Sequence, residues 1–124
     1  MHIPLDIELL SPKEGTSPIF LSVGYGNAHI VIEVSGPDAI DRWLSFIFAH
    51  REERGAHWLE IGRYVTLPVS FTMSSDCLSL IVDSDLTVDG FGQSVGLYIP
   101  RELLDSFIDG LAREHRKYVE KPAA

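Results

Sequence analysis

Two β-rich runs, residues 19–25 and 28–35, lie on either side of Gly26-Asn27 and constrain the fold more than any other feature. A glycine-asparagine pair readily adopts the positive φ angles of a two-residue hairpin turn. Such a turn would pair Tyr25 with Ala28, Val23 with Ile30, Leu21 with Ile32 and Ile19 with Val34. Because every pair is apolar, the turn and the side-chain alternation independently predict the same antiparallel hairpin with one buried face.

Further strands are predicted by the same alternation of apolar and polar residues. It occurs over residues 3–9, and again over 67–73 and 78–82. A turn at Ser75-Asp76 would pair Met73 with Leu78, Phe71 with Leu80 and Val69 with Val82. Residues 57–65 and 95–99 have the composition of two more strands. Pro68 lacks an N–H, so we expect its strand to begin late or to lie at an edge there.

Two helices are predicted by apolar residues at three- and four-residue spacing. The first begins at Pro37, has Arg51 and Arg54 in its last turn, and ends before Gly55. The second begins at Pro100 and continues to Val119, with acids early and bases late, as the helix dipole favours. Residues 121–124 should fray.

The order of these elements predicts an α+β fold. We expect a single domain over residues 1–124, with a mostly antiparallel sheet of about six strands in the order βββ-α-βββ-α and both helices packed on it. Hydrophobic residues make up 45% of the chain, which is enough to form a core.

Charge and cysteine content restrict the class of partner and the compartment. The 18 acidic and 10 basic residues give a net charge of −8, which argues against nucleic acid or an anionic membrane as a partner. The single cysteine, Cys77, excludes an internal disulfide, and the N-terminus shows no secretory signal. We therefore expect a cytoplasmic protein.

Candidate catalytic and metal-binding residues do not form a recognisable motif. Cys77 has no histidine near it in sequence that would lower its pKa, so we interpret it as a buried or half-buried thiol. His50 and His57 could bind a metal with Glu53 or Glu60, but the predicted helix ends between the two histidines, which argues against a metal site. The sequence therefore favours a non-enzymatic protein without a cofactor.

The acidic residues are unevenly distributed. Residues 1–41 carry six acids and one base, and residues 64–100 carry four acids and no lysine or arginine. The loop from Asp83 to Gly96 falls in the second stretch and contains no base. Since binding residues concentrate on loops held by a rigid sheet, we predict that this loop contacts a partner through Asp83, Asp85, Asp89 and Phe91.

Two segments, Trp58-Leu-Glu-Ile-Gly-Arg-Tyr-Val65 and Leu97-Tyr-Ile-Pro-Arg-Glu-Leu-Leu104, give the chain a family resemblance. A small acidic α+β chain with such segments resembles the immunity proteins with which bacteria neutralise toxins. The resemblance implies a non-enzymatic inhibitor, a monomer or homodimer, that binds a basic partner protein such as a toxin.

Two other functions are compatible with the sequence. One is a small-ligand-binding or enzymatic domain with a pocket between sheet and helices, lined by residues among His29, His57, Glu60 and Tyr64. The other is a homo-oligomeric scaffold subunit.

Overall fold

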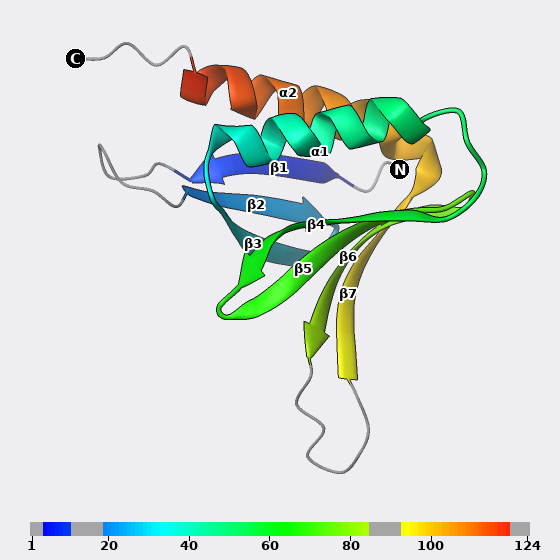
Figure 1. Cartoon of the computed structure of the whole chain (residues 1–124), viewed down its shortest axis with the longest axis horizontal. Helices are drawn as coiled ribbons and strands as arrows, with labels where there is room; N and C mark the ends of the chain where they lie inside the picture. The colour runs from blue at the N-terminus through cyan, green and yellow to red at the C-terminus, as the bar shows by residue number, and fades with distance from the viewer. Residues whose placement is uncertain (1–3, 11–18, 85–92, 120–124) are drawn as a thin grey trace.

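A computed structural model describes the backbone of residues 4–10, 19–84 and 93–119. The elements follow one another along the chain as β1 (Leu5–Leu10), β2 (Ile19–Tyr25), β3 (Ala28–Val34), α1 (Pro37–His50), β4 (His57–Tyr64), β5 (Leu67–Met73), β6 (Cys77–Ser84), β7 (Gln93–Pro100), a 3₁₀ turn η1 (Arg101–Leu103) and α2 (Leu104–Val119). The predicted α+β fold is confirmed (Figure 1). The strand count is seven rather than about six, because four strands and not three follow α1.

The seven strands form one antiparallel sheet in which chain order and spatial order are the same. The predicted pairs of the β2–β3 hairpin are confirmed from Ile19–Val34 to Tyr25–Ala28. The predicted pairs of β5 with β6 are confirmed as well. At Pro68 the strand pairs with β4, and its pairing with β6 starts one residue later, at Val69. The missing N–H of Pro68 is accommodated there, as expected.

The junction between β3 and β4 is the weakest in the sheet, because a single residue pair, Glu33 and Arg63, joins the two strands. β4 is also irregular between Glu60 and Gly62, where its register with β5 shifts. A β-bulge bends and twists a strand. Accordingly, β4 to β7 curve away from β1 to β3, while α1 and α2 lie side by side on one side of the sheet (Figure 1).

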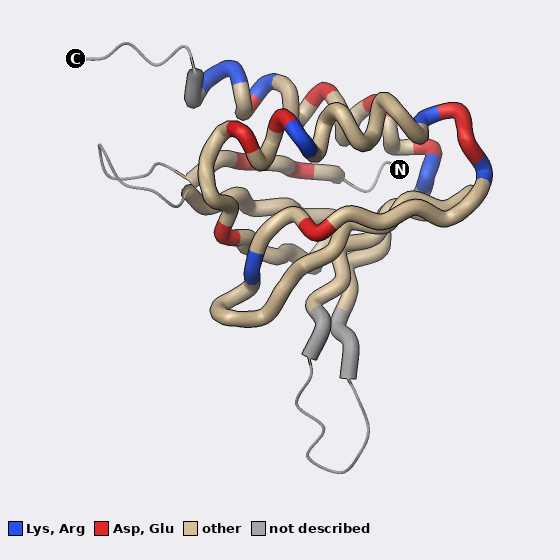
Figure 2. The backbone as a smooth tube through the Cα atoms, in the orientation of Figure 1, with Lys and Arg blue, Asp and Glu red and all other residues tan. Residues whose placement is uncertain are grey.

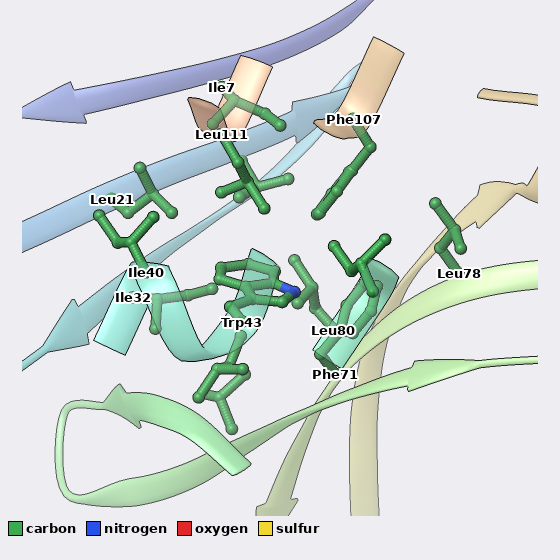
Figure 3. Close-up of a cluster of buried hydrophobic side chains, with 14 of the residues drawn as sticks. Ile7, Leu21, Ile32, Ile40, Trp43, Phe71, Leu78, Leu80, Phe107 and Leu111 are labelled. Carbon is green, nitrogen blue, oxygen red and sulfur yellow. The ribbon is translucent and has the colours of Figure 1, made fainter. Parts of the chain in front are cut away.

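The core is centred on Trp43 of α1, whose side chain is fully buried. Its ring centroid lies 5.3 Å from that of Phe71 on β5 and 5.5 Å from that of Phe107 on α2. Figure 3 shows aliphatic side chains from both helices and from both halves of the sheet around these rings. Trp43 therefore joins all the layers of the fold. No helix within the described residues is long and apolar enough to cross a membrane.

α2 covers the edge strand β1 through a buried carboxylate. The side chain of Glu114 is 3% exposed and accepts a hydrogen bond of 2.9 Å from the backbone N–H of Leu9. Arg113 lies 3.2 Å and Lys117 2.8 Å from the other carboxylate oxygen. Arg113 also donates to the Ile7 carbonyl oxygen at 3.3 Å. Two backbone groups on the free edge of β1 are thus paired by α2.

Burial raises the pKa of Glu114, but its hydrogen bonds with Lys117, Leu9 and Arg113 outweigh burial, so the pKa lies below its ordinary value of 4.5. A lowered folded-state pKa stabilises the protein above the unfolded-state pKa, and this contribution is lost as pH falls through the folded-state value. We expect Glu114→Gln to lower the free energy of unfolding by about 1–2 kcal/mol at pH 7. Urea unfolding at pH 7 and at about pH 3 checks this, since the difference between the two proteins should shrink in acid. A difference that is equal at both pH values would contradict it.

Candidate functional site

Helix α1 ends at His50, four residues earlier than Arg54, where the sequence predicted its last turn. The Glu53 N–H donates to the His50 carbonyl oxygen at 3.0 Å, so a tight turn replaces the next helical turn. The predicted C-terminal glycine, Gly55, consequently lies in the connection to β4 rather than directly after the helix. The prediction of the helix end was wrong, and contacts with distant residues supply the reason.

Arg101, the first residue of η1, links the turn after α1 to the turn between β5 and β6 by hydrogen bonds. Its guanidinium donates to the carbonyl oxygens of Arg51 at 2.7 Å and Glu53 at 3.2 Å. The same group donates to the Ser74 carbonyl oxygen at 2.6 Å, in the turn between β5 and β6. The carbonyls of Arg51 and Glu53 thus have partners outside the helix, which favours ending α1 early. The side chain of Arg51 also forms an ion pair with Asp105 of α2, with an N–O distance of 2.6 Å.

This arrangement brings His50, Glu53 and His57 together at the junction of α1 and β4. One Glu53 carboxylate oxygen, Oε2, lies 2.8 Å from His50 Nδ1 and 2.5 Å from His57 Nε2. The two imidazole rings stack, with centroids 3.9 Å apart and an interplanar angle of 19°. The ring of Phe46 packs on His50 with a centroid distance of 4.8 Å.

The electrostatics of this cluster favour an ionised carboxylate. The hydrogen bond from His50 lowers the pKa of Glu53, and the nearby His57 lowers it further. About half of the Glu53 side chain and roughly a third of each histidine side chain are exposed, so the cluster is open to solvent. The potential ligand atoms of the three residues all lie within 4.8 Å of one another.

The sequence argued against a metal site at these residues, because the predicted helix ends between the two histidines. The helix does end between them, but the turn that follows reverses the chain, and β4 begins at His57. Spacings of three and four residues link Glu53 to His50 and His57. No local motif encodes that turn, since the guanidinium that holds it belongs to a residue 48 positions after Glu53.

A second feature is the face of β4 to β7 that points away from the helices. Cross-strand pairing places Trp58, Thr72, Ser79 and Tyr98 in one row across these four strands. Trp58 is 69% and Tyr98 61% exposed. Three strand spacings separate them, about 14 Å along the sheet. Two large aromatic side chains are therefore exposed on one face, with the half-buried Thr72 and the buried Ser79 between them.

The surroundings of Tyr98 keep its ring against the sheet. A Cβ placed on Gly96 would lie 3.0 Å from Tyr98 Cε2 and 3.1 Å from its Cζ, so the ring covers this glycine, which lies two residues earlier on the same strand. Glu60, two residues after Trp58, is exposed on the same strand. β5 and β7 contain no charged residue (Figure 2). Arg63, three residues after Glu60, is exposed on the same strand as well, so this outer face combines aromatic groups with one acid and one base.

Within the described residues, a hollow that bears on the pocket hypothesis lies beside the β3–β4 junction. It has a volume of about 450 Å³, is open to solvent, and is lined in part by Glu33, Arg42, Glu60 and Arg63. Of the residues that the sequence suggested for a pocket, only Glu60 lines it. Two arginines and two glutamates give no excess charge toward a ligand. The hollow therefore favours no ligand class.

The loop residues predicted to contact a partner cannot be placed in this geometry. Asp85, Asp89 and Phe91 lie outside the described residues, and Asp83 is described only as a backbone position of β6 paired with Ser94. Cys77 is half-buried, as predicted, with its Sγ 3.6 Å from the Ser74 hydroxyl. Comparisons of the chain with protein-family models, curated proteins and solved structures find no match.

Proposed function

We propose that this protein is a non-enzymatic, acidic binding module of the immunity or inhibitor type, which neutralises a basic partner protein such as a toxin in the cytoplasm. The observation that carries the proposal is the outer face of β4 to β7, where the exposed side chains of Trp58 and Tyr98 lie in one row across the sheet. Residues 64–100 contain neither lysine nor arginine, and the whole chain has a net charge of −8.

The chemistry of this face fits arginine and lysine side chains of a partner. Cations are attracted to the faces of exposed tryptophan and tyrosine rings, and Arg stacks on them. The strand that carries Trp58 contains both Glu60 and Arg63, so the excess of acids in this region comes from residues 64–100. Large aromatic residues also dominate the binding energy of protein interfaces. The acidic field of the chain would speed the encounter with such a partner.

Neutralisation by this route needs no chemistry from the module. A bound protein that covers the partner's basic site blocks access to it, and affinity alone determines the degree of inhibition. Asp83 lies in β6 rather than in a loop, and Asp85 and Asp89 follow that strand in the same base-free stretch of the sequence. We therefore keep Asp83, Asp85, Asp89 and Phe91 as the second part of the proposed contact surface.

We expect Trp58→Ala combined with Tyr98→Ala to weaken partner binding by about 100-fold, because each truncation of an interface aromatic costs at least 1–2 kcal/mol. The partner is first captured with the intact chain, and association and dissociation rates are then measured at several salt concentrations. Asp85→Lys with Asp89→Lys should slow association and leave the melting temperature nearly unchanged.

The matched control is Phe48→Ala, which removes an exposed aromatic side chain from α1, away from the outer face. Its binding should equal that of the intact chain. The captured partner should also inhibit growth when expressed alone and lose that effect when this protein is coexpressed. Binding that is insensitive to salt, or equally weakened by Phe48→Ala, would refute the proposed surface.

A further inference from the structure

We propose that His50, Glu53 and His57 form a binding site for one Zn²⁺ ion or a similar late first-row divalent cation. The site is independent of the outer sheet face, because its residues belong to the end of α1, the following turn and the first position of β4. Its ligand atoms would be His50 Nδ1, Glu53 Oε2 and His57 Nε2, the three atoms that already converge.

The donor set selects the class of metal. Two imidazole nitrogens and one carboxylate oxygen suit Zn²⁺, Co²⁺, Ni²⁺ and Cu²⁺, whereas Ca²⁺ and Mg²⁺ prefer oxygen ligands alone. Three protein ligands leave one position of a tetrahedral zinc ion for a water molecule or another ligand. The partial exposure of all three side chains gives that position access to solvent.

The present distances are close to those that a metal ion needs. Ligands at about 2.0–2.1 Å from a tetrahedral zinc ion lie roughly 3.3 Å from one another. The two distances to Glu53 Oε2, 2.8 and 2.5 Å, are hydrogen-bond lengths, so the carboxylate would move outward by less than about 1 Å to admit the ion. Since Glu53 is about half exposed, nothing packed around it prevents this movement.

The supporting contacts hold the ligands in place before a metal ion arrives. Arg101 fixes the backbone carbonyl of Glu53, and the ring of Phe46 packs on His50. His57 is anchored as a strand residue, paired with the buried Met73. The backbone of the site is thus ordered in advance, which favours metal binding, and one imidazole has to rotate out of the stacked pair so that both ring nitrogens point at one ion. Both imidazoles present a ring nitrogen to the same carboxylate oxygen, so the three potential ligand atoms lie within 4.8 Å of one another.

The test is isothermal titration of the full chain with ZnCl₂ after treatment with a chelator. We expect one ion per chain, and a tenfold or greater loss of affinity in His57→Gln and in Glu53→Gln, because each removes a ligand or its charge. Co²⁺ bound to the intact chain should show the visible absorption of a four-coordinate site. The matched control is His29→Gln, which removes an exposed histidine of β3 far from the cluster in sequence.

A second readout does not depend on the folding of any variant. In the intact chain, one equivalent of Zn²⁺ should shift the imidazole NMR signals of His50 and His57 and leave those of His29 and His115 in place. All titrations are repeated with His2→Gln, because an N-terminal histidine can bind metal by itself. Absence of stoichiometric binding, or signals that shift only at His2, His29 or His115, would overturn the proposal.

Discussion

Replacing Trp43 by alanine is expected to lower the free energy of unfolding by about 3–5 kcal/mol, the cost of removing a large buried aromatic side chain. The indole is fully buried and contacts the rings of both Phe71 and Phe107. These three rings come from α1, β5 and α2, so no neighbouring element can collapse into the cavity without moving another. Urea unfolding followed by circular dichroism measures the change.

The other tryptophan supplies the matched control. Trp58→Ala removes a side chain of the same type that is 69% exposed, so its effect on stability should be within about 0.5 kcal/mol. Small domains are stable by about 5–15 kcal/mol, so Trp43→Ala would remove a large part of the total. Equal destabilisation by the two substitutions would mean that Trp43 is not the centre of the core.

Replacing Gly62 by alanine is expected to cost about 2–3 kcal/mol, at the upper end of the range for overpacking. A Cβ at this position would lie 2.4 Å from the Glu33 carbonyl oxygen and 2.8 Å from Ile32 Cγ2. The first of these atoms belongs to backbone and cannot rotate away. β3 and β4 would therefore have to separate next to Glu33–Arg63, the one residue pair that joins them.

Thermal unfolding and amide hydrogen exchange test this prediction together. Gly62→Ala should lower the melting temperature, and the amides near Glu33 and Arg63 should exchange faster than in the intact chain. Gly24→Ala is the control, because a Cβ there meets its nearest atoms at 3.5 Å or more, which is ordinary van der Waals contact. If both alanine variants are equally stable, the close approach of β3 and β4 does not require glycine.

Hairpin registers and core faces could be predicted from the sequence because local alternation determines both. With two residues in the turn, Gly26-Asn27 allowed one register for β2 and β3 that kept every inward pair apolar. The same reasoning placed Phe71 opposite Leu80. Apolar residues at three- and four-residue spacing predicted the first helix, and Trp43 of that helix is fully buried. In each case the interacting residues are close in sequence, and one misplaced residue would expose apolar side chains.

The His50–Glu53–His57 cluster could not be predicted in this way. Its geometry depends on where α1 ends. That end depends on hydrogen bonds from the guanidinium of Arg101, which lies about fifty residues later in the sequence. Similarly, the positions of Trp58 and Tyr98 in one row follow from the registers of three successive strand pairs. An error in any one register would have moved the two rings apart.

The sequence by itself therefore determined the α+β class, the order of the elements and the buried faces, because those depend on the periodicity of neighbouring residues. The tertiary structure decided the early end of α1, the convergence of two histidines on one carboxylate, and the single residue pair between β3 and β4. These features require contacts between side chains and backbone groups of distant segments. Such contacts depend on the packing of the whole chain and not on any local sequence pattern.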